Sequence, residues 1–348
     1  MRPFSVFSAG FLFVFGLSGA CFAALGAGPV PGGRPAEDPS LGVVRALLAT
    51  PEGQVDFARA KVTIDRLIDP SIDGPGTLRQ LDAWAATVRA RFPAGASKRV
   101  KLDILLSTLY KPGPWNQYRP FSYDLDGDPS GEKLSNMLIS NYLIHRKGQC
   151  ISMPTLVLIL GQKLGLPVTL ATAPKHAMVK YGDEESGHWL NVEATAGFIS
   201  SDSEYEREAG VTALAIRNEI YLRPLSQREA VALLVTTLMN ANEERGNPMP
   251  NFKLADAMLE VDPKNVNAML SKANAFYLLT MQRYKRMYKR ESDIPPAIRK
   301  DYLFLTRQNQ WWGQQAEALG WTAWTAEQQR QYVKNIEREK AKRKRSNK

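Results

Sequence analysis

Length, composition and charge set the first limits on this protein. The chain has 348 residues, 44% of them hydrophobic, which predicts two domains or one domain with an appendage and is enough for a real core. The formal net charge is +10, but residues 338–348 alone hold seven basic side chains and one acidic one. The rest of the chain is therefore close to neutral, which excludes an evenly basic, nucleic-acid-binding body.

The N-terminus has the pattern of a secretory signal peptide. Residues 1–3 carry a positive charge, and residues 4–17 form an apolar run that is too short to span a bilayer as a mature helix. We therefore predict a signal peptide at residues 1–23 and an exported, periplasmic protein. Cleavage before Cys21 would instead leave a lipid anchor, but the lipobox leucine is one place out of register, so we favour the soluble form. No other apolar run is long enough to form a transmembrane helix in the mature chain.

A proline- and glycine-rich linker, residues 24–40, precedes a mainly helical front half. Apolar residues recur there at three- and four-residue spacing, which predicts amphipathic helices. These helices are expected at residues 41–48, 54–67, 76–92 and 98–110. Their apolar stripes are typical of a packed core rather than of a cofactor site.

The central stretch contains Cys150. A helix is predicted over residues 134–145, and Gly148 would end it because glycine enters the left-handed conformation without steric cost. A buried helix then covers residues 156–164, and Pro154 is tolerable only in its first turn. Cys150 therefore lies at or just before a helix N-terminus, where amide N–H groups and the positive dipole end favour thiolate over thiol.

Cysteine usage supports a reactive thiol. Cys21 either leaves with the signal peptide or is acylated, so Cys150 has no intramolecular disulfide partner in an exported chain. A buried, inert cysteine is the alternative, and it would be favoured if Cys150 stood alone. The histidine and the glutamate described next reverse that preference.

Three short strands follow, at residues 167–173, 175–181 and 188–195. The polar segment 182–187 suits a hairpin connection between the last two. If Tyr181 pairs with His188, His176 lies directly opposite Glu193, with Cβ atoms roughly 5 Å apart. The carboxylate can then hold the imidazole tautomer, and the imidazole can take the thiol proton.

These motifs resemble the transglutaminase-like, papain-like-fold core, in which a cysteine begins a helix, a histidine lies on one strand and an acidic residue on the next. The resemblance extends to the SirB1-like branch with tetratricopeptide repeats, on the motifs at residues 115–124, 128–131 and 146–154. It covers about residues 55–210 and implies an α+β domain, in which helices pack on a small antiparallel sheet, with Cys150, His176 and Glu193 as the catalytic triad. Glu193 departs from the usual aspartate, but a longer arm can still orient an imidazole.

Further residues are expected to support this triad. The backbone N–H groups of Cys150 and Gln149 are candidate oxyanion donors, and we assign Gln149, Asn191 and Trp189 to an oxyanion or supporting role. Residues 197–205 are expected to form a loop along one wall of the cleft.

No metal or other cofactor is predicted. The segment 124–131 resembles half a calcium loop, but Pro129 and Ser135 stand where the turn glycine and the bidentate glutamate belong. A turn in which Asp128 or Ser130 caps the next helix is favoured.

The three histidines lack metal-ligand spacing relative to Cys150. We expect His145 to be a core residue on the apolar stripe of its helix. His188 is expected at a strand end beside the hairpin loop.

The transglutaminase-like domain is predicted to span residues 41–222, and a tetratricopeptide-like helical region residues 223–335. Helices are expected at residues 225–245, 252–263 and 266–276, and again through 297–335. This region is either a protein- or peptide-binding surface or a stabilising cap. The tryptophans at 311, 312, 321 and 324 are expected to dock the terminal helices onto the body.

Residues 336–348 form a basic tail that is solvated or weakly attracted to an anionic envelope surface; nucleic acid is not expected as a partner. The sequence therefore predicts an exported thiol enzyme that acts on an amide or isopeptide bond of a protein or peptide, by hydrolysis or acyl transfer. The alternative is a non-catalytic periplasmic binding or assembly protein that retains a relic triad.

Overall fold

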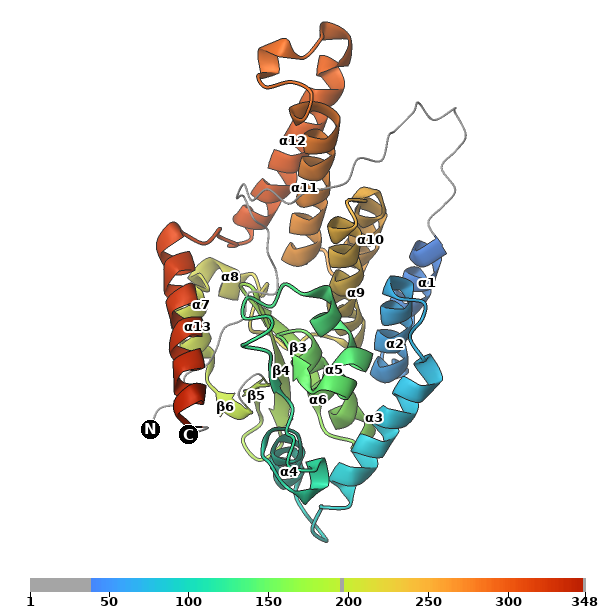
Figure 1. Ribbon diagram of the computed structural model, residues 1–348, viewed down its shortest axis with the longest axis vertical. Coiled ribbons are helices and arrows are strands. Elements are labelled where there is room, and N and C mark those ends of the chain that lie inside the picture. The colour runs from blue at the N-terminus through green and yellow to red at the C-terminus, as the bar shows by residue number, and fades with distance from the viewer. Residues whose placement is uncertain (1–38, 195–196, 347–348) are drawn as a thin grey trace.

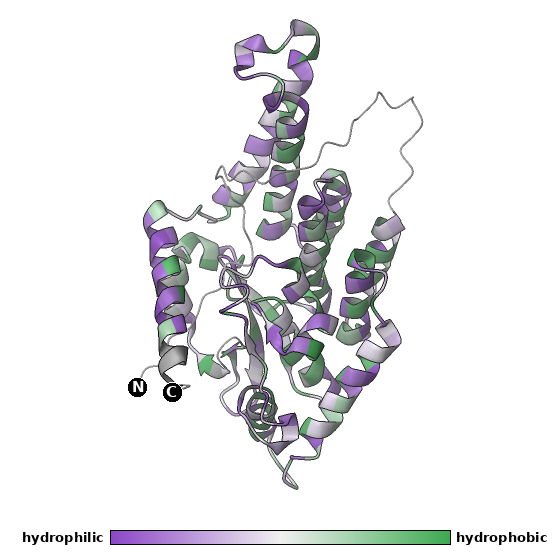
Figure 2. Ribbon diagram, viewed as in Figure 1, coloured by the Kyte–Doolittle hydropathy of each residue, from purple (hydrophilic) through white to green (hydrophobic). Residues whose placement is uncertain are grey.

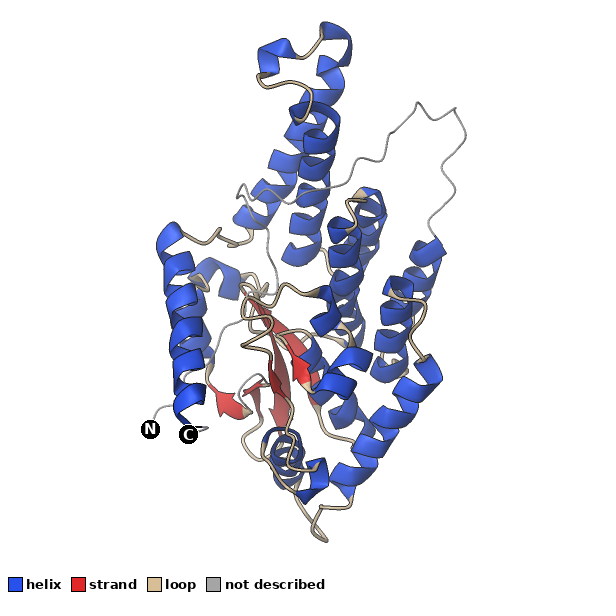
Figure 3. Ribbon diagram, in the orientation of Figure 1, coloured by secondary structure: helices blue, strands red, loops and turns tan. Residues whose placement is uncertain are grey.

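The computed structural model describes residues 39–194 and 197–346. A small sheet lies at the centre, the first three helices (residues 39–89) run along one side and the C-terminal helix along the other (Figure 1). The architecture is a mixture of helices and small sheets, as the α+β prediction requires (Figure 3). The predicted signal peptide and almost all of the predicted linker lie outside the described residues.

Four helices form the front half, close to their predicted positions. They are α1 (Pro39–Leu48), α2 (Phe57–Ile68), α3 (Gly74–Arg89) and α4 (Lys98–Tyr110). Asp56, Asp73 and Ser97 precede α2, α3 and α4, and each side chain accepts an N–H bond from the first turn. Such capping satisfies backbone donors that have no partner inside the helix.

A buried ion pair links the front helices to the rest of the fold. Lys61 Nζ lies 2.8 Å from Asp65 Oδ1 on α2, and both side chains are fully buried. Lys61 also donates to Thr237 Oγ1 (3.3 Å), and the N–H of Ile139 donates to Asp65 Oδ2 (2.7 Å). Burial raises the pKa of Asp65, and the charge of Lys61 opposes this shift. The pair therefore joins three separate parts of the chain.

The segment before Cys150 differs in detail from the prediction. It forms a 3-10 turn (Leu134–Met137) and the short helix α5 (Ile139–His145). Arg146, rather than Gly148, takes the left-handed conformation (φ 56°) that ends α5. The prediction for His145 was also wrong, because this side chain is exposed at the end of the short helix.

Gly148 does not end the helix, but the space around it leaves no room for a side chain. A Cβ there would lie 2.6 Å from Ser152 Oγ and from Tyr142 Cδ2. Gly148 lies in β2 (Lys147–Gly148), which pairs in parallel with β1 (Ser122–Tyr123). The motif stretches at residues 115–124 and 146–154 therefore lie side by side.

The main sheet has four antiparallel strands in the order β3-β4-β5-β6. They are β3 (Val168–Ala173), β4 (His176–Asp183), β5 (His188–Glu193) and β6 (Phe198–Ser200). Helix α6 (Ser152–Lys163) packs against β3 and β4, and every residue from Ser152 through Gly161 is buried. Pro154 lies in the first turn of α6, as predicted.

The prediction of a loop at 197–205 was wrong. Gly197 is followed by β6 and then by helix α7 (Asp202–Ala209), and α8 (Ala213–Arg217) comes next. The segment is polar and short of apolar residues, so it lacks the hydrophobic period that identifies an element in sequence. It adds an edge strand to the sheet and a helix beside it.

The C-terminal part is a series of helices that pack each on the next. They are α9 (Gln227–Glu244), α10 (Met249–Val261), α11 (Val266–Thr280) and α12 (Pro296–Ala318), with a π-helical turn after α11 (Met281–Lys285). Helices α11 and α12 extend away from the sheet (Figure 1). The tetratricopeptide assignment of this series stays a prediction.

The last helix, α13 (Ala326–Ser346), is mostly hydrophilic (Figure 2). Its Gln328 side chain lies close to Gly210, the residue that follows α7. The helix predicted through 297–335 is thus interrupted by residues 319–325, where Gly320 has a φ of 107°. Trp312, Trp321 and Trp324 pack against the main core, whereas Trp311 remains half exposed. Among the described residues, no helix combines the length and the apolar content needed to span a bilayer.

A partly buried carboxyl group in the helical series gives the fold a pH dependence. Glu243 on α9 accepts hydrogen bonds from Asn274 (2.8 Å) and Asn251 (3.3 Å), and burial raises its pKa from 4.5 to about 7. The folded protein therefore keeps a proton that the unfolded chain releases between these pH values. The contribution of this group to stability is full below pH 4.5 and should fall by on the order of 3 kcal/mol as the pH rises from 4.5 through 7.

Replacing Glu243 by glutamine should remove this decline, since the amide stays neutral. Melting temperatures measured from pH 4.5 to 8 test this, with exposed Glu244→Gln as the matched control. If the melting temperature of Glu243→Gln fell with pH as steeply as that of the wild type, Glu243 would not be the cause of the decline.

Candidate active site

His176 and Glu193 are brought together by neighbouring strands. His176 is the first residue of β4 and Glu193 the last of β5, and their Nε2 and Oε2 atoms lie 2.9 Å apart. Both side chains are essentially excluded from solvent, at 1% and 0% exposure. A buried carboxylate that accepts from one ring nitrogen fixes which nitrogen carries the proton.

The strand register differs from the predicted one. Tyr181 pairs with Leu190, not with His188, so the ladder is shifted by two residues and Glu193 is diagonal to His176. The cause is the hairpin, whose strands continue through Gly182 and Asp183 to a four-residue loop that begins at Glu184. A shift of two residues keeps Glu193 on the face of His176, whereas a shift of one would not. Diagonal neighbours are within reach of long side chains.

Cys150 lies two residues before α6 and is fully buried. The α-helical bonding pattern has already begun there, because Met153 N–H donates to the carbonyl of Gln149 (3.0 Å). The prediction that Cys150 lies just before a helix is therefore confirmed. The thiol therefore lies just before the helix that packs on β4, the strand of His176.

A network of turns holds the start of α6 in place. The Ser152 hydroxyl donates to the carbonyl of Asn136 (2.7 Å), and the Asn136 amide donates to Asp124 and Asp128 (3.0 Å each). Asp128 also accepts the N–H groups of Glu132 and Lys133 and so closes a turn. The prediction that Asp128 or Ser130 caps the next helix was wrong, because the residue before that helix is Lys133 and no side chain caps it. Among the described residues, no cluster of acidic, cysteine or histidine side chains suits a metal ion.

The backbone and the side chain of Gln149 differ in their hydrogen bonding. Its backbone N–H donates to Ser152 Oγ (3.1 Å), so it is already engaged. Its side-chain oxygen accepts the N–H of Ile151 (2.9 Å), which fixes the amide orientation. The amide nitrogen Nε2 is buried and has no hydrogen-bond partner within the described ranges 39–194 and 197–346. Such an orphaned donor is uncommon in a folded interior.

Sequence reasoning missed two tyrosines at this site. The Tyr205 hydroxyl on α7 donates to Glu193 Oε2 (2.7 Å), and its ring stacks on His176 with centroids 5.8 Å apart. Tyr110, at the end of α4, is buried near Glu193, and burial together with that charge raises its pKa. No sequence pattern identified either residue, because both approach Glu193 only through the tertiary fold.

Comparison with known families identifies the region that carries this site. The model of the transglutaminase-like superfamily matches residues 76–236, a range that includes Cys150, His176 and Glu193. Residues 76–236 form a transglutaminase-like domain. A comparison with curated proteins finds no match.

Among solved structures, the chain is similar to menin, which was described with its binding site for the Mixed Lineage Leukemia (MLL) protein. The identity is 16% and the TM-score 0.34, over 85% of this chain and 87% of that one. A likeness at this TM-score supports no conclusion about fold or function.

The other two predicted support residues, Asn191 and Trp189, lie on β5 with Glu193. The Asn191 amide donates to Asp202 Oδ1 (2.6 Å), and Lys180 Nζ donates to the same oxygen (2.7 Å). Lys180 and Asn191 face each other across β4 and β5. Asn191 therefore anchors the first residue of α7.

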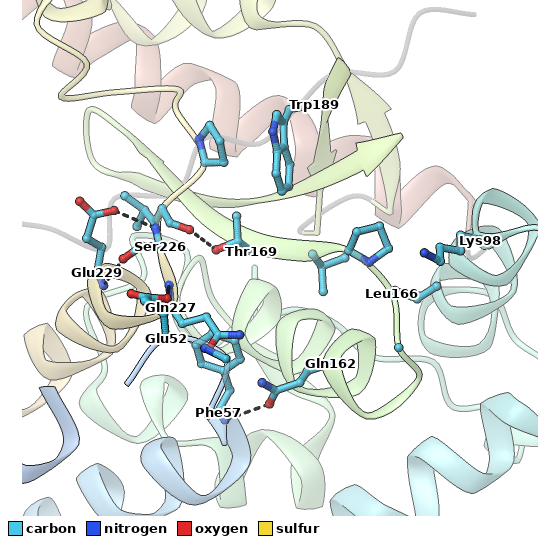
Figure 4. Close-up of a pocket in the computed structure, with 16 residues that line it drawn as sticks. Glu52, Phe57, Lys98, Gln162, Leu166, Thr169, Trp189, Ser226, Gln227 and Glu229 are labelled. Carbon is cyan, nitrogen blue, oxygen red and sulfur yellow. Dashed lines mark hydrogen bonds between the residues drawn. The ribbon is translucent and has the colours of Figure 1, made fainter. Parts of the chain in front are cut away.

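Trp189 is at the opposite end of β5 from Glu193. Its ring is 45% exposed and stands over a surface hollow of about 770 Å³ (Figure 4). The hollow is also lined by Phe57, Lys98, Gln162, Thr169 and Leu225. Trp189 is therefore part of this hollow and separate from the His176–Glu193 pair.

Proposed function

We propose that the transglutaminase-like domain is a thiol enzyme that acts on an amide or isopeptide carbonyl of a protein or peptide. Cys150 is the nucleophile, His176 the general base and then acid, and Glu193 the group that orients His176. The observation that supports this most strongly is the buried His176–Glu193 contact of 2.9 Å on strands covered by the helix that begins after Cys150. Paired base and orienting carboxylate are the recurring partners of an activated nucleophile.

The tautomer follows from the contact. The ionised Glu193 accepts from Nε2–H, so Nδ1 is the basic nitrogen, and we assign it to the thiol of Cys150. The thiolate attacks the carbonyl carbon, the C–N bond breaks, and the leaving amine takes the proton from the imidazolium. The resulting thioester is resolved by water in hydrolysis or by a second amine in transfer, with Nδ1 removing the proton of the attacking group.

The oxyanion formed during attack needs hydrogen-bond donors. We assign this role to the backbone N–H of Cys150 and to the side-chain Nε2 of Gln149. The buried Nε2 is fixed by the Ile151 contact and holds two N–H groups without a partner in the described chain. A donor that meets its acceptor only in the transition state is one way in which an enzyme stabilises that state selectively.

Export and a binding role for the C-terminal helices complete the proposal. The N-terminal pattern of residues 1–23 supports a periplasmic location, with a lipid anchor at Cys21 as the alternative. The helical series α9–α12 supports a protein partner, in the manner of tetratricopeptide repeats in the SirB1-like branch.

A small acyl donor tests the proposal without knowledge of the natural substrate. Because Cys150, His176 and Glu193 are buried, a compact ester such as p-nitrophenyl acetate reaches the thiol more readily than a protein would. We expect a burst of p-nitrophenol with one equivalent per chain, followed by slower turnover. Added methylamine should speed turnover if the enzyme transfers acyl groups to amines.

Cys150→Ala and His176→Ala are the decisive comparisons. Both should lose the burst while keeping the melting behaviour of a folded chain. If the wild type and both variants released p-nitrophenol slowly, linearly and at equal rates, this result would contradict the enzyme proposal and favour the binding or assembly protein.

A further inference from the structure

We propose that Tyr205 is a positioning residue that keeps Glu193 charged and aligned with His176. This inference rests on the proposed function, because it assigns Tyr205 an effect on the reactivity of Cys150. It also gives a role to helix α7, which the sequence did not predict.

The central observation is one shared oxygen atom. Glu193 Oε2 lies 2.7 Å from the Tyr205 hydroxyl and 2.9 Å from His176 Nε2. Both groups approach as donors, since a tyrosine hydroxyl has one proton and the imidazole donates Nε2–H. Two donors on the same oxygen fix the rotation of the carboxylate and hence the direction in which it holds the imidazole.

The charge on Glu193 depends on these donors. The carboxyl group is fully buried, and burial disfavours the charged form, whereas donated hydrogen bonds favour it. The titratable groups that the described residues place against it are His176 from β4, Tyr205 from α7 and Tyr110 from α4. Tyr205 is the neutral donor among them that bonds Oε2 directly. Its loss should let the carboxyl group take up a proton at a higher pH.

The position of Tyr205 is itself held by the strands that carry the site. Asp202, the first residue of α7, accepts hydrogen bonds from Lys180 on β4 and Asn191 on β5. These two residues share a face of the sheet with His176 and Glu193, by the alternation of strand side chains. The same pair of strands therefore places both the histidine–glutamate contact and the helix that delivers the tyrosine.

Tyr205→Phe isolates the hydroxyl, because the phenyl ring keeps the stacking on His176. The readout is the thiolate absorbance of Cys150 as a function of pH, in the full chain with Cys21→Ser. We expect the midpoint of thiolate formation to rise by about one pH unit, roughly a tenfold loss of thiolate on the acid side. The rate of the p-nitrophenol burst with p-nitrophenyl acetate should fall by a similar factor.

Tyr181→Phe is the matched control, because Tyr181 is buried on β4 but on the face opposite to His176. Tyr181→Phe should leave the midpoint of Cys150 thiolate formation unchanged. A midpoint equal to wild type in Tyr205→Phe would overturn the inference, even if stability fell, because a packing role alone does not move the titration. An ordinary thiol midpoint in the wild type itself would instead overturn the proposed function.

Discussion

Replacing Asp65 by alanine should lower the free energy of unfolding by about 3 to 5 kcal/mol. The substitution leaves Lys61, whose side chain is fully buried, without its carboxylate 2.8 Å away. It also removes the acceptor of the Ile139 N–H at the start of α5. An unpaired charge and an unpaired donor in the interior both act against the folded state. Urea unfolding at pH 7 measures the loss.

A surface ion pair provides the comparison. Asp82 lies 2.7 Å from Lys163, but its side chain is 65% exposed. Asp82→Ala should cost less than about 1 kcal/mol, since water screens the pair. If Asp65→Ala cost no more than Asp82→Ala, the buried pair would not be a stabilising link between α2, α5 and α9.

Replacing Glu193 by glutamine should nearly abolish the reactivity of Cys150. The glutamine amide can donate to Nε2, which would move the imidazole proton to Nδ1 and remove the base that we propose for the thiol. Enzymes that lose the orienting carboxylate of a triad slow by about 10⁴-fold, so a fall of about 10² to 10⁴ in the burst rate is expected. The p-nitrophenyl acetate burst at neutral pH is the measurement.

Asp183→Asn controls for the loss of a carboxylate from the same sheet. Asp183 lies at the far end of β4, where it accepts the N–H of Ser186 in the hairpin. Its substitution should leave the burst unchanged. A burst in Glu193→Gln as fast as in Asp183→Asn would remove Glu193 from the mechanism.

The sequence determined the helices well where an apolar stripe met a capping residue. Helix α4 begins and ends at the predicted residues, because Ser97 caps it and its buried leucines repeat at helical spacing. The prediction failed for 197–205, where the residues that form β6 and α7 are mostly polar. Their positions are set by contacts such as that of Asp202 with Lys180, which no local pattern encodes.

The candidate site was predictable in its residue types but less so in its geometry. The hairpin was expected to turn at Gly182, yet this glycine lies within β4 and the turn comes two residues later. His176 and Glu193 still meet because strand side chains alternate with a period of two. Tyr205 could not be identified, since only the tertiary fold carries α7 back to Glu193.

The proposal that Cys150 is an activated nucleophile is tested most directly by titrating its thiolate in the wild type and in His176→Ala. An ordinary cysteine titrates near pH 8.5, and activated ones titrate at roughly 3.5 to 7.5. If Cys150 is activated, its midpoint in the wild type should lie in that lower range and should return toward about 8.5 in His176→Ala. An ordinary midpoint in the wild type that His176→Ala leaves unchanged would contradict this proposal.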